Sequence, residues 1–143
     1  MKNKLFENIK ILLIKYEFIE FALIFGSYAE ETQSNLSDID VAVYLSTDVD
    51  LLTVGKIISE LEKVISCKID FVILNNLYSK NPLFSFEIIN KSKLLFVRNS
   101  DLLVDYKTRT QLEYFDTEKL RDASREALRK RIADKKFGKR NYA

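Results

Sequence analysis

The amino-acid sequence predicts one α/β (α+β) domain, with a small mixed β-sheet flanked by helices and a long helix toward the C-terminus. Its 143 residues match the usual size of a single domain. Hydrophobic residues make up 47% of the chain, which is enough apolar material for a packed core. Segments with helical and strand periodicity follow the order α-β-β-α-β-α-β-α, which is typical of this fold class.

The first part of the chain is predicted to form one helix and two strands. Apolar side chains recur at helical spacing from Leu5 to Tyr16, which indicates an amphipathic helix. The continuous apolar run 21–25 is typical of a strand covered on both faces. Alternation over residues 38–45 predicts a second strand, whose odd-numbered residues point one way and whose even-numbered residues point the other.

The middle of the chain continues with a helix and a third strand. Helical spacing over residues 54–65 predicts a helix that Asp48 or Asp50 can cap at its start. Residues 68–74 (KIDFVIL) have the composition and alternation of a strand. These two elements extend the predicted sheet to three strands.

The remaining segments are mostly helical. A helix is expected from the Asn-Pro pair at 81–82 to about residue 90, because proline is favoured at the first helical position. Residues 94–97 predict a short fourth strand. From residue 100 the pattern is helical for most of the remaining chain, with a break expected near Asp116.

Composition excludes several kinds of catalytic site. The chain has no histidine, which excludes Ser-His-Asp, Cys-His and His-zinc chemistry. Its single cysteine, Cys67, cannot close an intrachain disulfide, as expected in a reducing compartment. No segment resembles a signal peptide or a membrane span, so we expect a cytoplasmic protein without a membrane partner. Chemistry must therefore depend on carboxylates, hydroxyls, lysine or a metal ion bound by oxygen atoms.

Charge is unevenly distributed along the chain. Residues 125–143 carry eight Lys and Arg side chains against two acidic ones, which gives this stretch a net charge of +6. Because the whole chain carries +2, residues 1–124 carry −4. We expect a domain over residues 1–133 that includes the C-terminal helix, and a basic tail over residues 134–143 with no direct nucleic-acid partner. A solvated helix end explains such a tail as well as a binding role does.

A Gly-Ser pair is followed, after ten residues, by two aspartates on one face of a strand. Gly26 and Ser27 come directly after the predicted strand 21–25, where backbone and hydroxyl can approach phosphate oxygens closely. Asp38 and Asp40 lie about 6 to 7 Å apart at their Cα atoms on such a strand. Carboxylates this close repel unless a cation neutralises them or one keeps its proton. Mg²⁺ prefers oxygen ligands of this kind.

Asp70 is a third acidic candidate in an otherwise apolar strand, where an acid without a partner is costly. A neighbouring strand would place it across from Asp38 and Asp40. Three acids around metal ions, beside a phosphate-binding turn, provide the chemistry of phosphoryl or nucleotidyl transfer, in which one carboxylate accepts the proton of the acceptor hydroxyl. Each residue alone also has a structural explanation, such as pairing of Asp70 with Lys68 or Lys93.

The spacing of Gly26-Ser27 and Asp38-Ile39-Asp40 resembles the signature of the DNA polymerase β-type nucleotidyltransferase superfamily, and the short chain resembles its minimal branch. Other segments resemble the MntA-like antitoxins, which are encoded beside HEPN-domain (HepT-like) RNase toxins. The resemblance covers about residues 1–133. The segments that carry it are GSYA (26–29), VILNN (72–76), NPLFSFEII (81–89), KLLFVRNSD (93–101) and QLEYFDTEKLRDASREALRKRI (111–132).

The resemblance implies a nucleotidyltransferase fold and an adenylyltransferase that transfers AMP from ATP to a tyrosine of the toxin, thereby silencing its RNase activity. Gly26 and Ser27 would then hold the ATP phosphates. Asp38 and Asp40 would bind Mg²⁺, with Asp70 as the third ligand and the catalytic base.

One departure from the family pattern keeps two alternatives open. The family often has Arg-Gly after GSYA, whereas this chain has Glu30-Glu31. Two glutamates would repel a triphosphate, which favours an antitoxin that only binds the toxin and does not modify it. The other alternative is transfer to a small molecule, as in antibiotic-modifying relatives.

Overall fold

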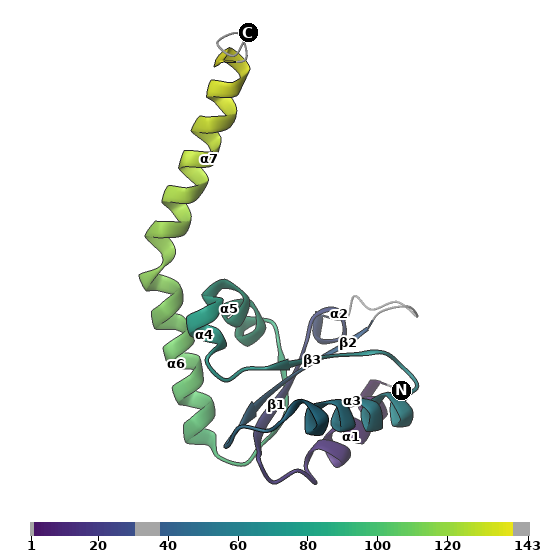
Figure 1. The fold of residues 1–143 in the computed structure, drawn as a ribbon. Helices are drawn as coiled ribbons and strands as arrows, with labels where there is room; N and C mark the ends of the chain where they lie inside the picture. The colour runs from purple at the N-terminus through teal and green to yellow at the C-terminus, as the bar shows by residue number, and fades with distance from the viewer. Residues whose placement is uncertain (1, 31–37, 139–143) are drawn as a thin grey trace.

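The computed structural model describes residues 2–30 and 38–138 and contains a four-stranded sheet with helices on both faces (Figure 1). The strand order is β3-β2-β1-β4. The predicted fold class is confirmed. The elements are α1 (Lys2–Leu13), β1 (Ile19–Phe25), α2 (Ser27–Glu30), β2 (Ile39–Leu45), α3 (Leu51–Ile65), β3 (Ile69–Ile73), α4 (Leu77–Lys80), α5 (Pro82–Asn90), β4 (Lys93–Val97), α6 (Ser100–Asp116) and α7 (Glu118–Gly138).

The sheet is mixed because one pair of its strands is parallel. β1 pairs antiparallel with both β2 and β4, while β2 pairs in parallel with β3. Helix α3 connects the parallel pair, since strands that run in the same direction need a crossover connection. The register places Asp40 directly beside Asp70, so two acids from separate segments lie on adjacent strands.

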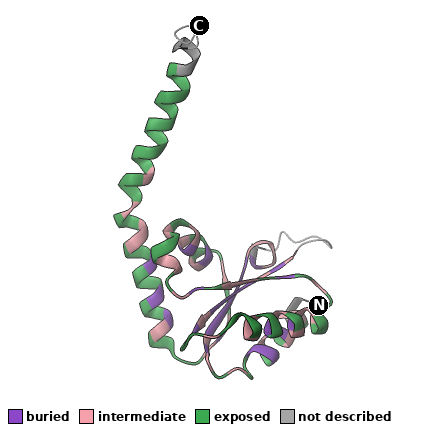
Figure 2. Ribbon diagram, viewed as in Figure 1, coloured by how far each residue is buried: buried purple, intermediate pink, exposed green. Residues whose placement is uncertain are grey.

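Each face of the sheet has its own hydrophobic core (Figures 1 and 2). α1 and α3 cover one face, where their apolar side chains pack against the odd-numbered residues of β2. α4, α5 and α6 cover the other face, where Ala42 belongs to the same cluster as Ile88 and Tyr106. Asp40 is an even-numbered residue of β2, like Ala42, and therefore faces the side covered by α5 and α6.

The side chains that begin two helices match the sequence expectations. Of the two candidate caps for α3, Asp50 serves, because its carboxylate accepts a hydrogen bond from the Thr53 N–H at 2.8 Å. The Asn81 side chain accepts from the Phe84 N–H at 3.2 Å, and Pro82 occupies the first position of α5.

The Asn75 side chain continues the pairing of β2 beyond the end of β3. Its amide nitrogen donates to the Leu45 carbonyl at 2.8 Å, and its amide oxygen accepts from the Leu45 N–H at 2.9 Å. One residue earlier, the Leu74 N–H donates to the Val43 carbonyl at 2.8 Å. A side-chain amide can replace a backbone amide here because it carries both a donor and an acceptor.

Two features differ from the sequence expectations. The helices α2 and α4 have four residues each and were not predicted, since a single helical turn is too short to show periodicity. Strand β4 pairs with β1, at the edge of the sheet opposite to β3. Lys93 is therefore not on the strand next to Asp70, and the alternative pairing of these two residues was wrong.

α6 packs against the body of the domain, and α7 continues beyond it as a long helical arm that leaves the body (Figure 1). The break between them lies at Thr117, next to the predicted Asp116. Arg121 spans the break: it donates to the Thr117 hydroxyl and to the Tyr114 carbonyl, each at 2.6 Å, and its guanidinium lies 4.0 Å from the Tyr114 ring centroid. Within residues 2–30 and 38–138, no helix is both long enough and apolar enough to cross a membrane.

A cluster of three buried hydroxyls joins α5 to α6. The Ser85 hydroxyl lies 2.7 Å from the Tyr106 hydroxyl and 3.0 Å from the Thr110 hydroxyl, and all three residues are buried. Buried polar groups need such partners because an unpaired one is costly. The cluster therefore fixes the position of α5 on the domain.

Replacing Ser85 should destabilise the domain, because Ser85→Ala leaves two buried hydroxyls without this shared partner. The free energy of unfolding should fall by about 1–3 kcal/mol in urea denaturation. Ser79→Ala, at an exposed serine of α4, is the matched control and should change it by less than about 0.5 kcal/mol. Equal stability of the two variants would contradict this account of the cluster.

Candidate active site

Asp40 and Asp70 bring two carboxyl groups into contact on neighbouring parallel strands. They are direct partners in the β2–β3 register, and their side chains are hydrogen-bonded to each other. Asp40 is partly buried, whereas Asp70 is exposed. Asp38, just before β2, is close enough to act electrostatically on Asp40. The structure thus brings Asp40 and Asp70 into contact, with Asp38 near enough to act on Asp40, while among the described residues the three acids do not already converge as a metal-binding group.

The electrostatics of this group favour a bound proton or a bound cation. Burial, the hydrogen bond that the Asp40 carboxyl donates to Asp70, and the negative charges of Asp70 and Asp38 raise the pKa of Asp40 to about 6 from its usual 3.8, with burial as the largest cause. Without a cation, a proton held by Asp40 relieves the repulsion between the acids. A divalent cation would relieve the same repulsion with both carboxyl groups ionised.

The exposure of Asp70 corrects one step of the sequence argument. That argument treated Asp70 as a costly acid within an apolar strand, but the residue lies on the edge strand β3 and is exposed. Its contact with Asp40 matters instead because it helps to raise the pKa of that residue.

Gly26 is packed so tightly against Asp40 that no other residue fits at its position. Its φ angle is +73°, and a Cβ atom built on it would lie 2.0 Å from Oδ2 of Asp40. Both the backbone conformation and the space therefore require glycine. Ser27 follows as the first residue of α2, so the predicted Gly-Ser turn lies directly beside the carboxyl pair.

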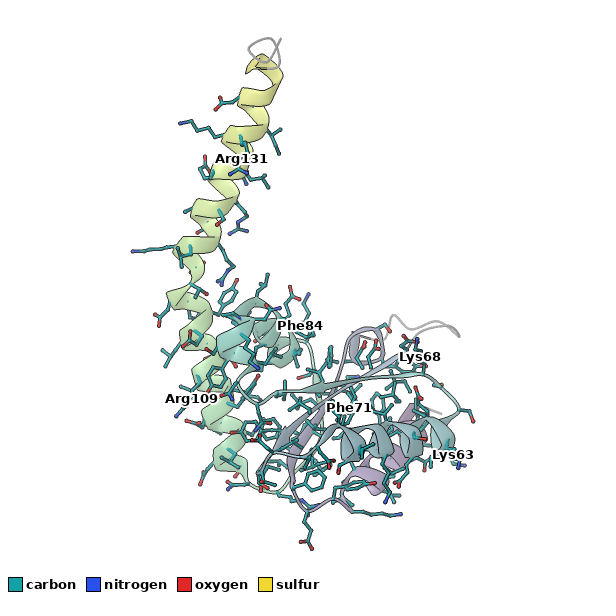
Figure 3. All side chains as sticks on the ribbon, in the orientation of Figure 1. Lys63, Lys68, Phe71, Phe84, Arg109 and Arg131 are labelled. Carbon is teal, nitrogen blue, oxygen red and sulfur yellow. The ribbon has the colours of Figure 1, made fainter. Side chains whose placement is uncertain are left out.

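A hollow of about 240 Å³ opens next to this turn. Its walls come from the end of β1 and from α5, which Figure 3 shows at the labelled Phe84. The Phe25 and Phe84 rings meet edge to face with their centroids 6.0 Å apart. The residues that line the hollow are Phe25, Gly26, Phe84, Glu87, Ile88 and Lys91. It therefore combines apolar rings with one acidic and one basic side chain.

The contribution of α5 to the site was missed in the sequence. Phe84, Glu87 and Lys91 follow ordinary helical spacing, and nothing in the sequence links them to Gly26, from which they are far removed along the chain. Only the packing of α5 beside the end of β1 brings them together. Of the Glu30-Glu31 departure, Glu31 lies outside the described residues and only the backbone of Glu30 is described.

The acids present suit Mg²⁺. In the part of the chain that the structure describes, no three acidic or cysteine side chains already form a complete metal site. Asp40 and Asp70 supply two contacting carboxyl groups, with Asp38 adjacent. Mg²⁺ is usually bound by one or two carboxylates together with waters and substrate phosphates, so this set of oxygen donors fits that ion.

Contacting carboxyl groups beside a Gly-Ser turn and a hollow are the parts that a nucleotidyltransferase needs. The sequence model of the family described as "Polymerase beta, Nucleotidyltransferase" matches residues 7–101. This range contains all five predicted site residues. The chain therefore belongs to the polymerase beta nucleotidyltransferase family, and the family resemblance expected from the sequence is confirmed.

Two similar proteins come from Methanocaldococcus jannaschii. One is named "Putative protein adenylyltransferase MJ0435" and is 32% identical over 90 residues, which cover 63% of this chain and 92% of that protein. The other is named "Putative protein adenylyltransferase MJ1217" and is 33% identical over 79 residues, which cover 55% of this chain and 80% of that protein. The similarity extends over most of the length of both relatives.

Solved structures of toxin–antitoxin complexes contain chains of the same fold. A chain of "the toxin-antitoxin with AMP-PNP" has a TM-score of 0.72 at 24% identity, covering 85% of this chain and 97% of that one. A chain of "tri-AMPylated Shewanella oneidensis HEPN toxin in complex with MNT antitoxin" has a TM-score of 0.72 at 19% identity. The match covers 90% of this chain and 98% of that one. These similarities establish that the fold is shared.

Replacing Gly26 should damage both stability and the site. In Gly26→Ala, the added Cβ meets the Asp40 carboxyl and the positive φ is strained, so the free energy of unfolding should fall by about 2 kcal/mol or more. Gly55→Ala is the matched control: a Cβ there meets nothing within 4 Å, and the helix α3 should become up to about 1 kcal/mol more stable. Urea denaturation measures both, and a Gly26→Ala variant as stable as the wild type would refute the close packing.

The metal-free protein should lose stability as the pH rises past the ordinary pKa of aspartate. The folded pKa of Asp40 lies above that of the unfolded chain, so stability is fully present below about pH 4 and falls between about pH 4 and pH 6. Asp40→Asn should lack this part of the pH dependence and melt higher than the wild type in EDTA at neutral pH.

Thermal melts with and without Mg²⁺ check this prediction. Mg²⁺ should raise the melting temperature of the wild type at neutral pH and leave that of Asp40→Asn unchanged. Asp48→Asn is the control, because Asp48 is exposed and does not belong to the cluster of Asp38, Asp40 and Asp70; this variant should behave as the wild type. A wild type and an Asp40→Asn variant with parallel pH profiles would rule out the repulsion inferred at Asp40.

Proposed function

We propose that this chain is an antitoxin that transfers AMP from ATP, with Mg²⁺, to a tyrosine of a HEPN-domain RNase toxin and so silences it. The observation that carries this proposal is the Asp40–Asp70 contact beside the Gly26 turn in a chain of the nucleotidyltransferase family. Two relatives named as protein adenylyltransferases support a protein as the acceptor. Solved toxin–antitoxin chains of the same fold support the toxin as that protein.

In this proposal the reaction is an in-line displacement at the α-phosphorus of ATP. Asp38, Asp40 and Asp70 would hold Mg²⁺, which when bound would supply positive charge to neutralise the phosphate oxygens. The tyrosine oxygen of the toxin attacks the α-phosphorus, and the bond from that phosphorus to diphosphate breaks. Asp70 accepts the phenolic proton, because it is the exposed member of the carboxyl pair and can reach an incoming hydroxyl. The products are AMP-tyrosyl toxin and diphosphate.

Gly26 and Ser27 bind the phosphates of ATP. The absence of a side chain at Gly26 lets phosphate oxygens approach the backbone, and the Ser27 hydroxyl and N–H can donate to them. The hollow beside Gly26 receives another part of the nucleotide, against the Phe25 and Phe84 rings. Lys91 on the wall of this hollow supplies positive charge near the triphosphate, which offsets the repulsion expected from Glu30-Glu31.

The second candidate function is an antitoxin that blocks the toxin by binding alone. The observation that favours it is Glu30-Glu31, because negative charge after the Gly-Ser turn weakens the attraction for a triphosphate. Such a protein would keep the fold and the toxin partner but would need neither Mg²⁺ nor ATP.

The double variant Asp38→Asn, Asp40→Asn should fold and yet fail to transfer AMP. Labelled ATP, Mg²⁺ and purified cognate toxin are incubated with each form, and AMP incorporation into the toxin is measured. The rate should fall by about 100-fold or more, since two ligands of the metal are lost. Asp48→Asn is the matched control and should retain the wild-type rate.

The same reaction separates the enzyme from the blocker. An enzyme inactivates the toxin at a small fraction of one equivalent, and the toxin gains the mass of whole AMP units and stays inactive after the antitoxin is removed. Inhibition that requires one antitoxin per toxin, reverses on separation and leaves the mass unchanged would establish the blocker. Equal labelling of the toxin by the wild type and the double variant would refute the assignment of Asp38 and Asp40 to the active site.

A further inference from the structure

Helix α7 carries a row of apolar side chains that the domain does not cover. Leu120, Leu128 and Ile132 are 69%, 53% and 52% exposed. At 100° per residue these side chains, with Ser124 and Ala127, lie along one side of the helix. We call these five residues the α7 stripe; Arg131 falls within the same arc and adds a cation to it. An apolar row of this length on a helix that leaves the body is typical of a surface that meets a partner.

The α7 stripe runs into a groove on the body of the domain. The groove has a volume of about 490 Å³ and lies between the start of α5 and the start of α7. Leu83 lines it from α5, while Leu120 and Ser124 line it from α7. Stripe and groove therefore form one continuous surface that could seat a helix.

This surface is connected to the candidate active site through α5. Pro82 and Leu83 of α5 line the groove, and Phe84, Glu87 and Ile88 of the same helix line the hollow next to Gly26. Leu83 and Phe84 are adjacent in the chain, so the two sites are neighbours on α5. A partner seated in the groove would therefore lie within reach of the carboxyl pair.

The charges beside the stripe define the chemistry of the partner. Arg121 and Arg125 line the groove and border the stripe along one side, and Lys130 borders it along the other. The acidic Asp122 and Glu126 lie on the opposite side of α7, where they pair with Arg125 and Arg129. The complementary surface is thus an apolar row bordered by acidic side chains.

A second copy of this chain fits the surface poorly. Two parallel α7 helices would bring like residues together, and two antiparallel ones centred on Glu126 would bring Arg121 of each near Arg131 of the other (Figure 3 shows Arg131 on α7). Both arrangements place cations against cations, which opposes pairing. RNA would meet the cations but would leave the apolar row without a partner.

We propose that the α7 stripe and the groove form the docking surface for an amphipathic helix of the toxin, one whose apolar side chains are bordered by Asp and Glu. This inference rests on the proposed function. Docking there holds the toxin on the arm while its tyrosine reaches Asp70, and it explains how so small a chain can bind a protein acceptor.

The test uses the exposed end of the stripe. In the double variant Leu128→Asp, Ile132→Asp, acidic side chains replace two exposed apolar ones, so the fold should be unaffected while acidic borders of the partner are repelled. The matched control is Val104→Asp, at a residue of α6 that is 61% exposed and outside the groove. The Kd for purified cognate toxin is measured by titration calorimetry, and binding of a fluorescent ATP analogue is measured without toxin.

The double variant should bind the toxin about 10-fold more weakly or worse, while Val104→Asp keeps the wild-type Kd. Both should bind the ATP analogue as the wild type does, and the circular dichroism spectra should be native. In AMP transfer, KM for the toxin should rise with kcat retained.

Three results would overturn the docking surface. One is an unchanged toxin Kd in the double variant. The second is a wild-type dimer that the variant dissociates with toxin affinity intact, which would assign the stripe to a second copy. The third is a single-stranded RNA oligomer that binds the wild type and loses affinity in the variant while toxin affinity is intact. Failure of the wild type to bind the ATP analogue would instead refute the proposed enzyme, and the toxin Kd would still test the docking surface.

Discussion

The position of the Asp40 carboxyl group is the constraint on which the site depends. It lies between the bare Cα of Gly26 on one side and the carboxyl group of Asp70 on the other. Only a strand placed between β1 and β3 can make both contacts, and β2 holds that place in the sheet. The antiparallel pairing with β1 brings the Gly-Ser turn to the start of β2, and the parallel pairing with β3 brings Asp70 to the same level.

Helix α5, on one side of the sheet, lines both the hollow beside the candidate active site and the groove. The hollow lies between the end of β1 and α5, next to the Gly26 that contacts the Asp40 carboxyl group, while the groove lies between the start of α5 and α7. The buried hydroxyls of Ser85, Tyr106 and Thr110 hold that helix in place from below. Because α5 is fixed in this way, it holds the candidate active site and the proposed docking surface at a constant position relative to each other.

Local signals in the chain predicted much of this arrangement. Alternation placed Asp40 correctly on the side of β2 opposite to Ile39 and Val41, and the Asn81-Pro82 pair marked the start of α5. The remaining features depend on which strands pair and how the helices pack on them, and no local sequence pattern encodes these long-range contacts. The edge position of β3 decides that Asp70 is exposed, and the place of β4 beside β1 separates Lys93 from it. The hollow needs α5 to pack beside Gly26, which depends on the whole core.

Asn75 links the end of the sheet to the alignment of the acids. Parallel strands have no turn between them to fix their alignment, and a shift by one residue would turn every side chain of β3 to the opposite face. The two hydrogen bonds between Asn75 and Leu45 oppose a shift by one residue, because the N–H and carbonyl of the neighbouring residues of β2 point to the opposite edge of that strand. The Asn75 amide, at the far end of the parallel pair, thus helps to fix the β2–β3 register that places Asp70 opposite Asp40.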